Sequence, residues 1–227
     1  MLFFHPMDFL IIIAFLVSLW AQFRVKSTFN KWAEVPAASG MTGYEAARRL
    51  LDRNGLHDVP VEPVAGTLSD HYDPIARVVR LSEPVYYERS ISALSVACHE
   101  VGHAIQHQQS YPMLVLRHRM FPVVRFASGI APILLIAGFL FSAMNLVGFG
   151  IIFFAAAVAF QLVTLPVEFN ASSRARDLMV AEGFIDRSEE RGVAKVLNAA
   201  ALTYVAAALI SLLELLKFIM IFANNRE

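Results

Sequence analysis

The chain has 227 residues, of which 57% are hydrophobic and 17% are charged, and its formal net charge is zero. An ordinary soluble domain is about half apolar and about a quarter charged, so this composition argues against one. The balanced charge gives no basic footprint for nucleic acid, and the single cysteine, Cys98, excludes an intramolecular disulfide.

The chain begins with an apolar segment that runs from about Phe3 to Phe23. A run of about 20 apolar residues is long enough to cross a bilayer. The segment has no basic leader and no small-residue cleavage site before Arg24, so we expect an uncleaved membrane anchor over residues 1–23. Because Lys and Arg follow this segment but do not precede it, the N-terminus is expected outside and the next residues in the cytoplasm.

Residues 24–120 are expected to form a cytoplasmic catalytic region. Thr42 and Glu45 make a capping box that begins a helix, and Asn54-Gly55 ends it. Two short β-rich segments follow, Val59 to Val64 and Val78 to Leu81.

The polar stretch between these two segments is the start of a candidate substrate-binding edge. Zinc peptidases commonly hold a peptide as an added strand against an exposed sheet edge. The segment from His71 to Leu81 is our candidate for that edge, although a purely structural strand and turn explains the pattern equally well.

The region ends in the motif His99-Glu100-Val101-Gly102-His103. Residues four apart lie on one face of a helix, so His99 and His103 can bind one zinc ion from the same side. Glu100 is then placed to take a proton from the water at the metal. Apolar residues recur around the motif at helical spacing, so we predict a helix from about Ser90 to the stop at Tyr111-Pro112.

A catalytic zinc usually has three protein ligands and one open position. His107 is a poor third ligand, because a residue eight positions along a helix from His99 lies about 12 Å away along the axis. Glu168 is the better candidate, since two membrane spans between it and His103 would return the chain to the same side. His71 and His118 are weaker alternatives, and Glu168 could instead pair with Arg174 or cap a helix.

Two further spans, about Val123–Ala143 and Leu146–Leu165, are expected to form a membrane hairpin over residues 121–165. A short link around Asn145 to Gly148 would join them, and Pro132 would bend the first span.

Residues 166–196 are expected to form a cytoplasmic helix that carries the third zinc ligand. An apolar or membrane helix follows over residues 197–227, in which Glu214 and Lys217 can pair.

The basic residues give the expected orientation. Of the 19 Lys and Arg residues, all but Arg125, Lys217 and Arg226 fall in residues 24–120 or 166–198. By the positive-inside rule both of these regions are cytoplasmic, so we expect a multi-pass protein of the cell membrane whose active site faces the cytoplasm.

Four segments resemble the bacterial membrane-bound neutral zinc metallopeptidases, a family similar in layout to the heat-shock-type membrane zinc peptidases and the CAAX prenyl endopeptidases. These segments are Asp70-His71-Tyr72-Asp73-Pro74, the run from Val96 to Gln106, the run from Leu165 to Ser172, and Leu197-Asn198-Ala199-Ala200-Ala201-Leu202-Thr203-Tyr204. The resemblance implies a mainly α integral membrane protein with about four membrane helices and a small α+β zincin-like metallopeptidase domain, made of a short sheet and the HEXXH helix.

The resemblance also implies a zinc endopeptidase in which His99, His103 and Glu168 match the metal ligands and Glu100 the general base. The substrate would be a peptide or membrane protein, hydrolysed with a zinc-activated water. One position departs from the wider gluzincin pattern, because Ser172 stands where an acid usually orients a zinc-bound histidine. Candidate donors to the oxyanion are His71, Tyr72 and Tyr204.

Two other functions remain open at this point. A membrane zinc-binding scaffold that does not cut its partners would keep the metal ligands but has no need of Glu100. A site-2-type intramembrane protease would need the motif helix inside the bilayer. Polar residues flank the motif and favour a wet or interfacial helix instead: Glu88, Arg89, Gln106, His107, Gln108 and Gln109.

Overall fold

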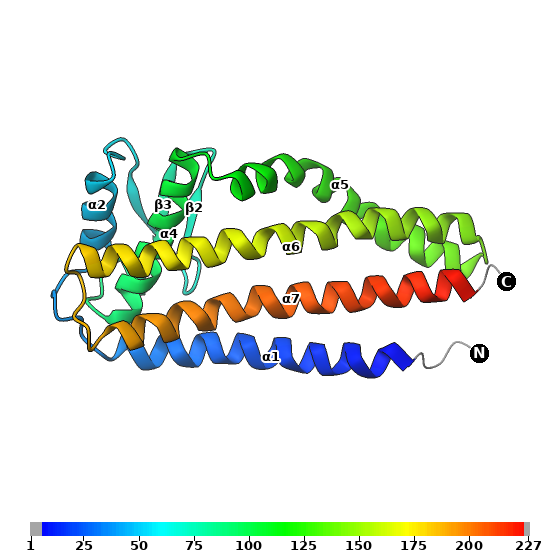
Figure 1. The fold of residues 1–227 in the computed structure, drawn as a ribbon, viewed down its shortest axis with the longest axis horizontal. Coiled ribbons are helices and arrows are strands. Elements are labelled where there is room, and N and C mark those ends of the chain that lie inside the picture. The colour runs from blue at the N-terminus through cyan, green and yellow to red at the C-terminus, as the bar shows by residue number, and fades with distance from the viewer. Residues whose placement is uncertain (1–5, 225–227) are drawn as a thin grey trace. The chain divides into compact units, whose positions relative to one another are not determined.

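A computed structural model describes residues 6–224 of the chain. It is mainly helical and contains one small sheet, which confirms the predicted fold class (Figure 1). The elements in chain order are α1 Pro6–Ala33, α2 Gly43–Arg53, β1 Val61–Val64, β2 His71–Asp73, β3 Val78–Ser82, α3 Glu83–Tyr86, α4 Ile91–Gln108, α5 Pro112–Leu140, α6 Met144–Ala181 and α7 Glu190–Asn224.

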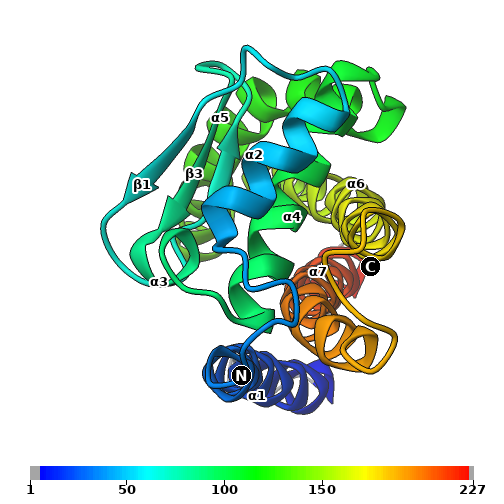
Figure 2. The same cartoon turned by 90° about the vertical axis from the view of Figure 1, so that its left-hand side faces the viewer.

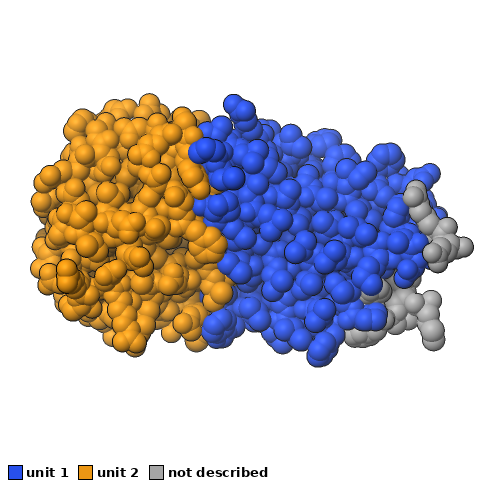
Figure 3. All heavy atoms as spheres, viewed as in Figure 1, with its two compact units in different colours: residues 1–21, 112–166, 203–227 blue, residues 22–111, 167–202 orange. Residues whose placement is uncertain are grey.

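The described residues divide into two compact units (Figure 3). Unit 1 holds residues up to 21, 112–166 and from 203, and unit 2 holds residues 22–111 and 167–202. The helix α6 therefore contributes residues to both units, as do α1 and α7.

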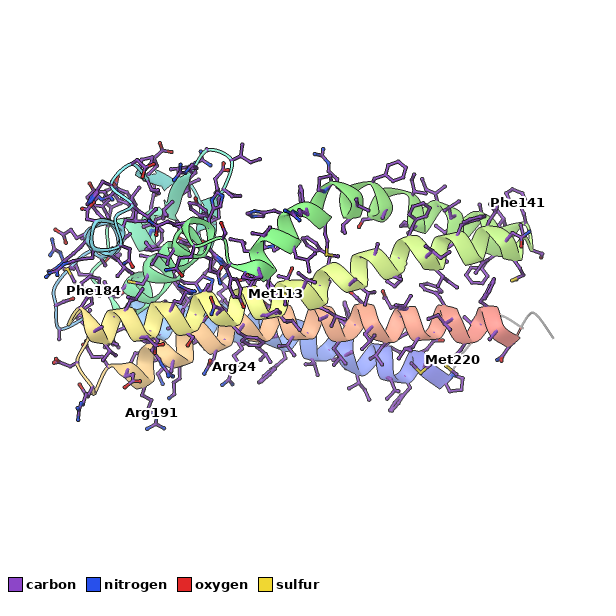
Figure 4. All side chains as sticks on the ribbon, turned by 45° about the horizontal axis from the view of Figure 1, so that its top comes forward. Arg24, Met113, Phe141, Phe184, Arg191 and Met220 are labelled. Atoms are coloured by element: carbon purple, nitrogen blue, oxygen red, sulfur yellow. The ribbon has the colours of Figure 1, made fainter. Side chains whose placement is uncertain are left out.

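Four helices, α1, α5, α6 and α7, are long and apolar enough to cross a membrane. Their side chains in unit 1 are mostly carbon, as Figure 4 shows for Met220 on α7 and for Phe141 in the turn after α5. Many of these apolar side chains point outward, and Phe141 is 73% exposed. An outward apolar surface of this extent fits a lipid environment, since soluble proteins rarely expose large apolar patches.

Within unit 1, a tight turn joins α5 to α6. Ser142 has a positive φ of 51°, and the Ala143 amide donates to the Gly138 carbonyl at 2.8 Å. The turn therefore lies at residues 141–143, and the predicted link at Asn145 to Gly148 is wrong because those residues already form the first turns of α6. Pro132 lies inside α5 as expected, and α5 changes direction along its length in Figure 1.

Lys217 on α7 forms an ion pair with Asp8 on α1, within unit 1. The spacing in the sequence allowed a pairing of Lys217 with Glu214 on the same helix, and it did not indicate the partner Asp8 on α1. Glu214 and Lys217 both line a pocket of about 370 Å³ between the helices of unit 1.

The helix α6 is continuous from Met144 to Ala181, with Pro166 inside it. The sequence predicted a separate helix after the apolar span, beginning near Glu168. The structure joins span and polar helix, because a proline in a helix removes one backbone donor without obliging the chain to stop. The helix ends at Ala181, and Gly183 just after it takes a positive φ of 66°.

The helix α2 of unit 2 begins with the predicted capping box. The Thr42 hydroxyl accepts from the Glu45 amide at 3.1 Å, and the Glu45 carboxylate accepts from the Thr42 amide at 2.7 Å. This fixes the start of α2, whose buried face includes Leu50 and Leu51. The helix packs against α4, and both lie on one side of the sheet (Figure 2).

The sheet has the strand order β1-β3-β2. β1 pairs with β3 in parallel, and β2 pairs with β3 in the antiparallel direction. The predicted edge segment from His71 to Leu81 is therefore half correct: β2 is an edge strand, whereas β3 is the central strand and has partners on both sides. The sequence did not predict the parallel pairing of β1 with β3.

Buried apolar side chains of unit 2 form its core. Leu50 of α2, Val79 of β3 and Leu94 of α4 belong to it, and so does Phe184 from the segment after α6. All four are at 0% exposure. Cys98 belongs to the same core and is also fully buried. Phe184, labelled in Figure 4, brings the segment after α6 into this core, and so holds residues 167–181 against α4.

Candidate active site

The motif helix α4 begins where Ser90 caps it, with the Ser90 hydroxyl accepting from the Ala93 amide at 3.1 Å. One face of the helix is buried among apolar side chains such as Leu94 and Val101. His99 and His103 stand one turn apart on another face, and their ring centroids are 4.8 Å apart. The helical prediction for the motif is confirmed, and it explains why both imidazoles reach the same point.

The second wall of the site is the part of α6 that belongs to unit 2. At Gly102 the two helices approach so closely that an added Cβ would lie 2.8 Å from the carbonyl oxygen of Ala171 and 3.3 Å from its Cα. Only glycine fits there, because the atoms that a side chain would meet are backbone. Gly102 lies between the two histidines along α4, and Ala171 lies three residues after Glu168. The close contact therefore brings Glu168 to the histidine pair.

Three side chains meet at this point. The Glu168 Oε2 atom lies 3.3 Å from His99 Nε2 and 3.4 Å from His103 Nε2. The side chains are largely buried, at 14% exposure for His99, 12% for His103 and 4% for Glu168. Among the His, Cys, Asp and Glu residues within 6–224, these three make the group that can hold a metal ion, with all ligand atoms within 4.8 Å of one another.

The donor set and its spacing fit zinc. Two imidazole nitrogens and one carboxylate oxygen are the ligands of one common class of catalytic zinc site. Zinc bonds of about 2.0–2.1 Å in a tetrahedron place neighbouring ligand atoms about 3.3–3.4 Å apart, which is the separation that Glu168 Oε2 keeps from both histidines. The same separation is long for a charged hydrogen bond, which is usually about 2.7–2.9 Å. The two separations that involve Glu168 are therefore those expected between zinc ligands.

Glu100 lies beside this group and is buried, at 8% exposure. Burial raises the pKa of its carboxyl to about 7, against the opposing effect of His99 and with further increases from the negative charges of Glu168 and Asp70. The backbone amide of Tyr72 in β2 donates to Glu100 and lowers the pKa. A cation held by the three neighbours would lower it too. A carboxyl group that titrates near neutral pH is suited to accept and return a proton.

The far nitrogens of the two histidines face uncharged partners. His103 Nδ1 lies 3.0 Å from the Gln106 Oε1 atom, and His99 Nδ1 lies 3.2 Å from the Ser172 Oγ atom. Ser172 thus occupies the place of the missing acid and contacts the imidazole itself. Gln106 was predicted to be a polar flanking residue of a wet helix. This prediction is wrong, because Gln106 is fully buried. Its position one turn after His103 was the signal for this contact.

Other residues considered in the sequence have different partners or belong to unit 1. His71 is exposed, with its Nδ1 atom 2.8 Å from the Ser69 carbonyl oxygen. His107 Nδ1 lies 2.9 Å from the Tyr72 hydroxyl, and both line a pocket of about 300 Å³ between β2 and α4. His118 is on α5 in unit 1, as Tyr204 is on α7. Neither belongs to the unit that holds the cluster.

The contacts within unit 2 settle the suggested pairing of Glu168 with Arg174 and show the surroundings of Cys98, the residue before His99. Arg174 bonds to Asn170 and Gln109 through its guanidinium, at 2.7 Å in each case, in place of the suggested pairing with Glu168. Cys98 is packed in the apolar core, where burial raises the pKa of its thiol to about 12. A thiol with that pKa is a poor metal ligand.

These features are those of a membrane metalloprotease: four candidate membrane helices, and a HEXXH helix that meets a glutamate from a second helix. The chain matches the family described as "Putative neutral zinc metallopeptidase" over residues 7–223, and it belongs to that family. It is 69% identical over 219 residues to the "Putative membrane protease YugP" of Bacillus subtilis (strain 168), which covers 96% of this chain and 97% of the relative. No solved structure matches the chain.

Proposed function

We propose that the protein is a zinc-dependent membrane endopeptidase in which His99, His103 and Glu168 hold the metal and Glu100 is the general base. The observation that carries this proposal is the common separation of 3.3–3.4 Å from Glu168 Oε2 to both imidazoles. Family membership supports a zinc peptidase, and the spacing supports these three residues as the ligands.

A bound zinc ion would supply a Lewis acid that polarises the scissile carbonyl and lowers the pKa of water. Glu100 takes the proton from the attacking water and returns it to the amine that leaves. The group must gain and lose a proton in each turnover. Burial raises its pKa and a neighbouring cation would lower it, so the two effects oppose each other in the loaded site. The burial of the cluster excludes bulk water and strengthens these electrostatic effects.

The substrate peptide is proposed to lie along β2. This strand is an edge of the sheet, so its outer side can accept a further strand through backbone hydrogen bonds. Tyr72 in the middle of β2 donates its backbone amide to Glu100, so a peptide on that edge would pass close to the general base. The three residues of β2 limit the contact to a short stretch of substrate.

The expected domain boundaries and the cytoplasmic orientation also remain proposals, the latter supported by the positive-inside bias of the basic residues. A site inside the bilayer is disfavoured, because α4 is not among the helices of the described chain that are long and apolar enough to span a membrane.

The experiment is zinc analysis of the detergent-purified full-length protein, followed by cleavage of casein before and after chelation. We expect about one zinc per chain, proteolysis that a chelator abolishes, and recovery when zinc is restored. Zinc binding without any cleavage of casein or of a membrane-protein substrate would favour the non-catalytic scaffold. A protein that binds no zinc in metal-replete buffer would contradict the proposal.

A further inference from the structure

Gln106 is a fully buried amide on α4, one turn after the second motif histidine. Its Nε2 atom donates to the backbone carbonyl of Val167 at 2.8 Å and to the Asn170 Oδ1 atom at 3.0 Å. Its Oε1 atom lies 3.0 Å from His103 Nδ1. A buried polar group left without partners is costly, so a side chain with these three contacts is held in one place.

The orientation of this amide follows from what faces it. A backbone carbonyl can only accept hydrogen bonds, so the Gln106 nitrogen must point to Val167. The Asn170 oxygen imposes the same choice, because the Arg174 guanidinium, which can only donate, already bonds to it at 2.7 Å. A flipped Gln106 amide would set oxygen against oxygen at both places. Two independent acceptors therefore direct the Gln106 oxygen toward His103.

An oxygen that faces an imidazole nitrogen requires a hydrogen on that nitrogen. A neutral His103 must then carry its hydrogen on Nδ1 and its lone pair on Nε2. Nε2 is the atom that lies 3.4 Å from Glu168 Oε2, at the proposed metal position. We propose that Gln106 is a positioning residue, which fixes the tautomer and ring orientation of His103 so that Nε2 is presented to zinc. This rests on the proposed function, since it takes His103 to be a ligand.

The other histidine has a different kind of partner. His99 Nδ1 faces the Ser172 hydroxyl at 3.2 Å, and a hydroxyl can donate or accept. Ser172 therefore contacts the ring without selecting its tautomer. The two histidines are unequal: His103 is preorganised by the fold, whereas His99 adopts the tautomer that the metal requires. Loss of Gln106 should accordingly weaken zinc binding more than loss of Ser172.

The test is the zinc dissociation constant of the full-length protein in detergent, measured by competition with a chromophoric chelator. Gln106→Met removes the acceptor and both donors, whereas Asn170→Ala removes one partner of the Gln106 nitrogen on α6 and leaves the Gln106 oxygen facing His103. Supporting residues of this kind usually contribute about tenfold to hundredfold in metal affinity, so we expect that loss in Gln106→Met. Asn170→Ala and Ser172→Ala should each lose less than Gln106→Met.

The matched control is Gln108→Met, a glutamine on the same helix that is exposed and bonds only to the Asn54 carbonyl through its Nε2. It should leave the zinc affinity unchanged. Equal affinities of Gln106→Met and the wild type would overturn the proposal. Equal losses in Gln106→Met and Asn170→Ala would also overturn it, because they would assign Gln106 to holding α4 against α6. A wild type without zinc would contradict the proposed function instead.

A measurement on the unmodified protein guards against variants that fail to fold. In the zinc-loaded protein labelled with ¹⁵N-histidine, we expect a slowly exchanging Nδ1–H signal that is lost in His103→Ala. Coordination of zinc through Nδ1 of His103 would overturn the proposal without any change at Gln106. Protection of the Cys98 thiol from alkylation reports whether each metal-free variant keeps its core, because this side chain is fully buried.

Discussion

Large apolar side chains face outward along the long helices of unit 1, whereas unit 2 gathers apolar side chains into a buried core. In unit 1, Phe9, Ile136 and Phe141 are each more than two-thirds exposed, at 68%, 67% and 73%. In unit 2, Leu94 and Phe184 are fully buried. Both units are rich in hydrophobic residues, so the difference lies in their direction. Unit 1 has a surface suited to lipid, whereas unit 2 has the core of a water-soluble domain.

Charged groups differ between the units as well. The ion pair of Asp8 and Lys217 in unit 1 joins two apolar helices, α1 and α7. In unit 2, Glu168 is held against two imidazoles, with Glu100 beside them. We therefore expect substitutions at the cluster in unit 2 to change metal binding and catalysis, and substitution of the ion pair in unit 1 to affect only stability.

The largest effect is expected from Glu100→Gln. The amide cannot accept a proton, so the rate of casein cleavage should fall by about 10²–10⁴-fold, the usual contribution of a general base. Zinc content should stay at the wild-type level, because Glu100 is not among the proposed ligands. Glu88→Gln, at an exposed position before the motif, is the control and should leave the rate unchanged. Full activity of Glu100→Gln would remove Glu100 from the mechanism.

Glu168→Ala should weaken zinc binding by more than about a hundredfold, because even supporting residues of a zinc site contribute up to that amount. Zinc analysis after dialysis against a weak chelator measures the loss. Asp177→Ala is the matched control, since Asp177 is an exposed acid on the same helix. Retention of zinc by Glu168→Ala would mean that the third ligand lies elsewhere.

Gly102→Ala tests the close approach of the two helices within unit 2. The added methyl would meet the Ala171 backbone at 2.8 Å, so α4 and α6 must separate by several tenths of an ångström. A displaced ligand weakens a metal site, and we expect about a tenfold loss of zinc affinity. Gly129→Ala is the control, because an added Cβ there meets nothing within 4 Å. Unchanged zinc affinity in Gly102→Ala would show that the helix spacing does not set the site.

The smallest effect is expected from Lys217→Met in unit 1. Loss of one partner from a partly exposed ion pair costs about 1 kcal/mol, which lowers the melting temperature of a chain of this size by about 2–4 °C. Thermal unfolding in detergent measures the change, and the exposed Lys26→Met should show none. Zinc affinity should be the same in both variants. A loss of zinc in Lys217→Met would contradict the division between the two units.

Several features of the chain could be predicted from the sequence because they depend on residues close together. The capping box of Thr42 and Glu45 and the pairing of His99 with His103 on one helix face are set by spacings of three and four residues. The four long apolar helices follow from composition over windows of about 20 residues. Local spacing and composition decide such features, so they need no knowledge of the fold.

Other features were decided only by tertiary structure. The order β1-β3-β2, the pairing of Lys217 with Asp8 and the burial of Gln106 all join residues distant in the chain. The sequence placed Glu168 near the histidines by counting spans, but the close contact of Gly102 with Ala171 is what brings it within 3.4 Å of both. Which polar side chain is buried depends on the partners that the fold supplies, because burial is tolerated only when every donor and acceptor is satisfied.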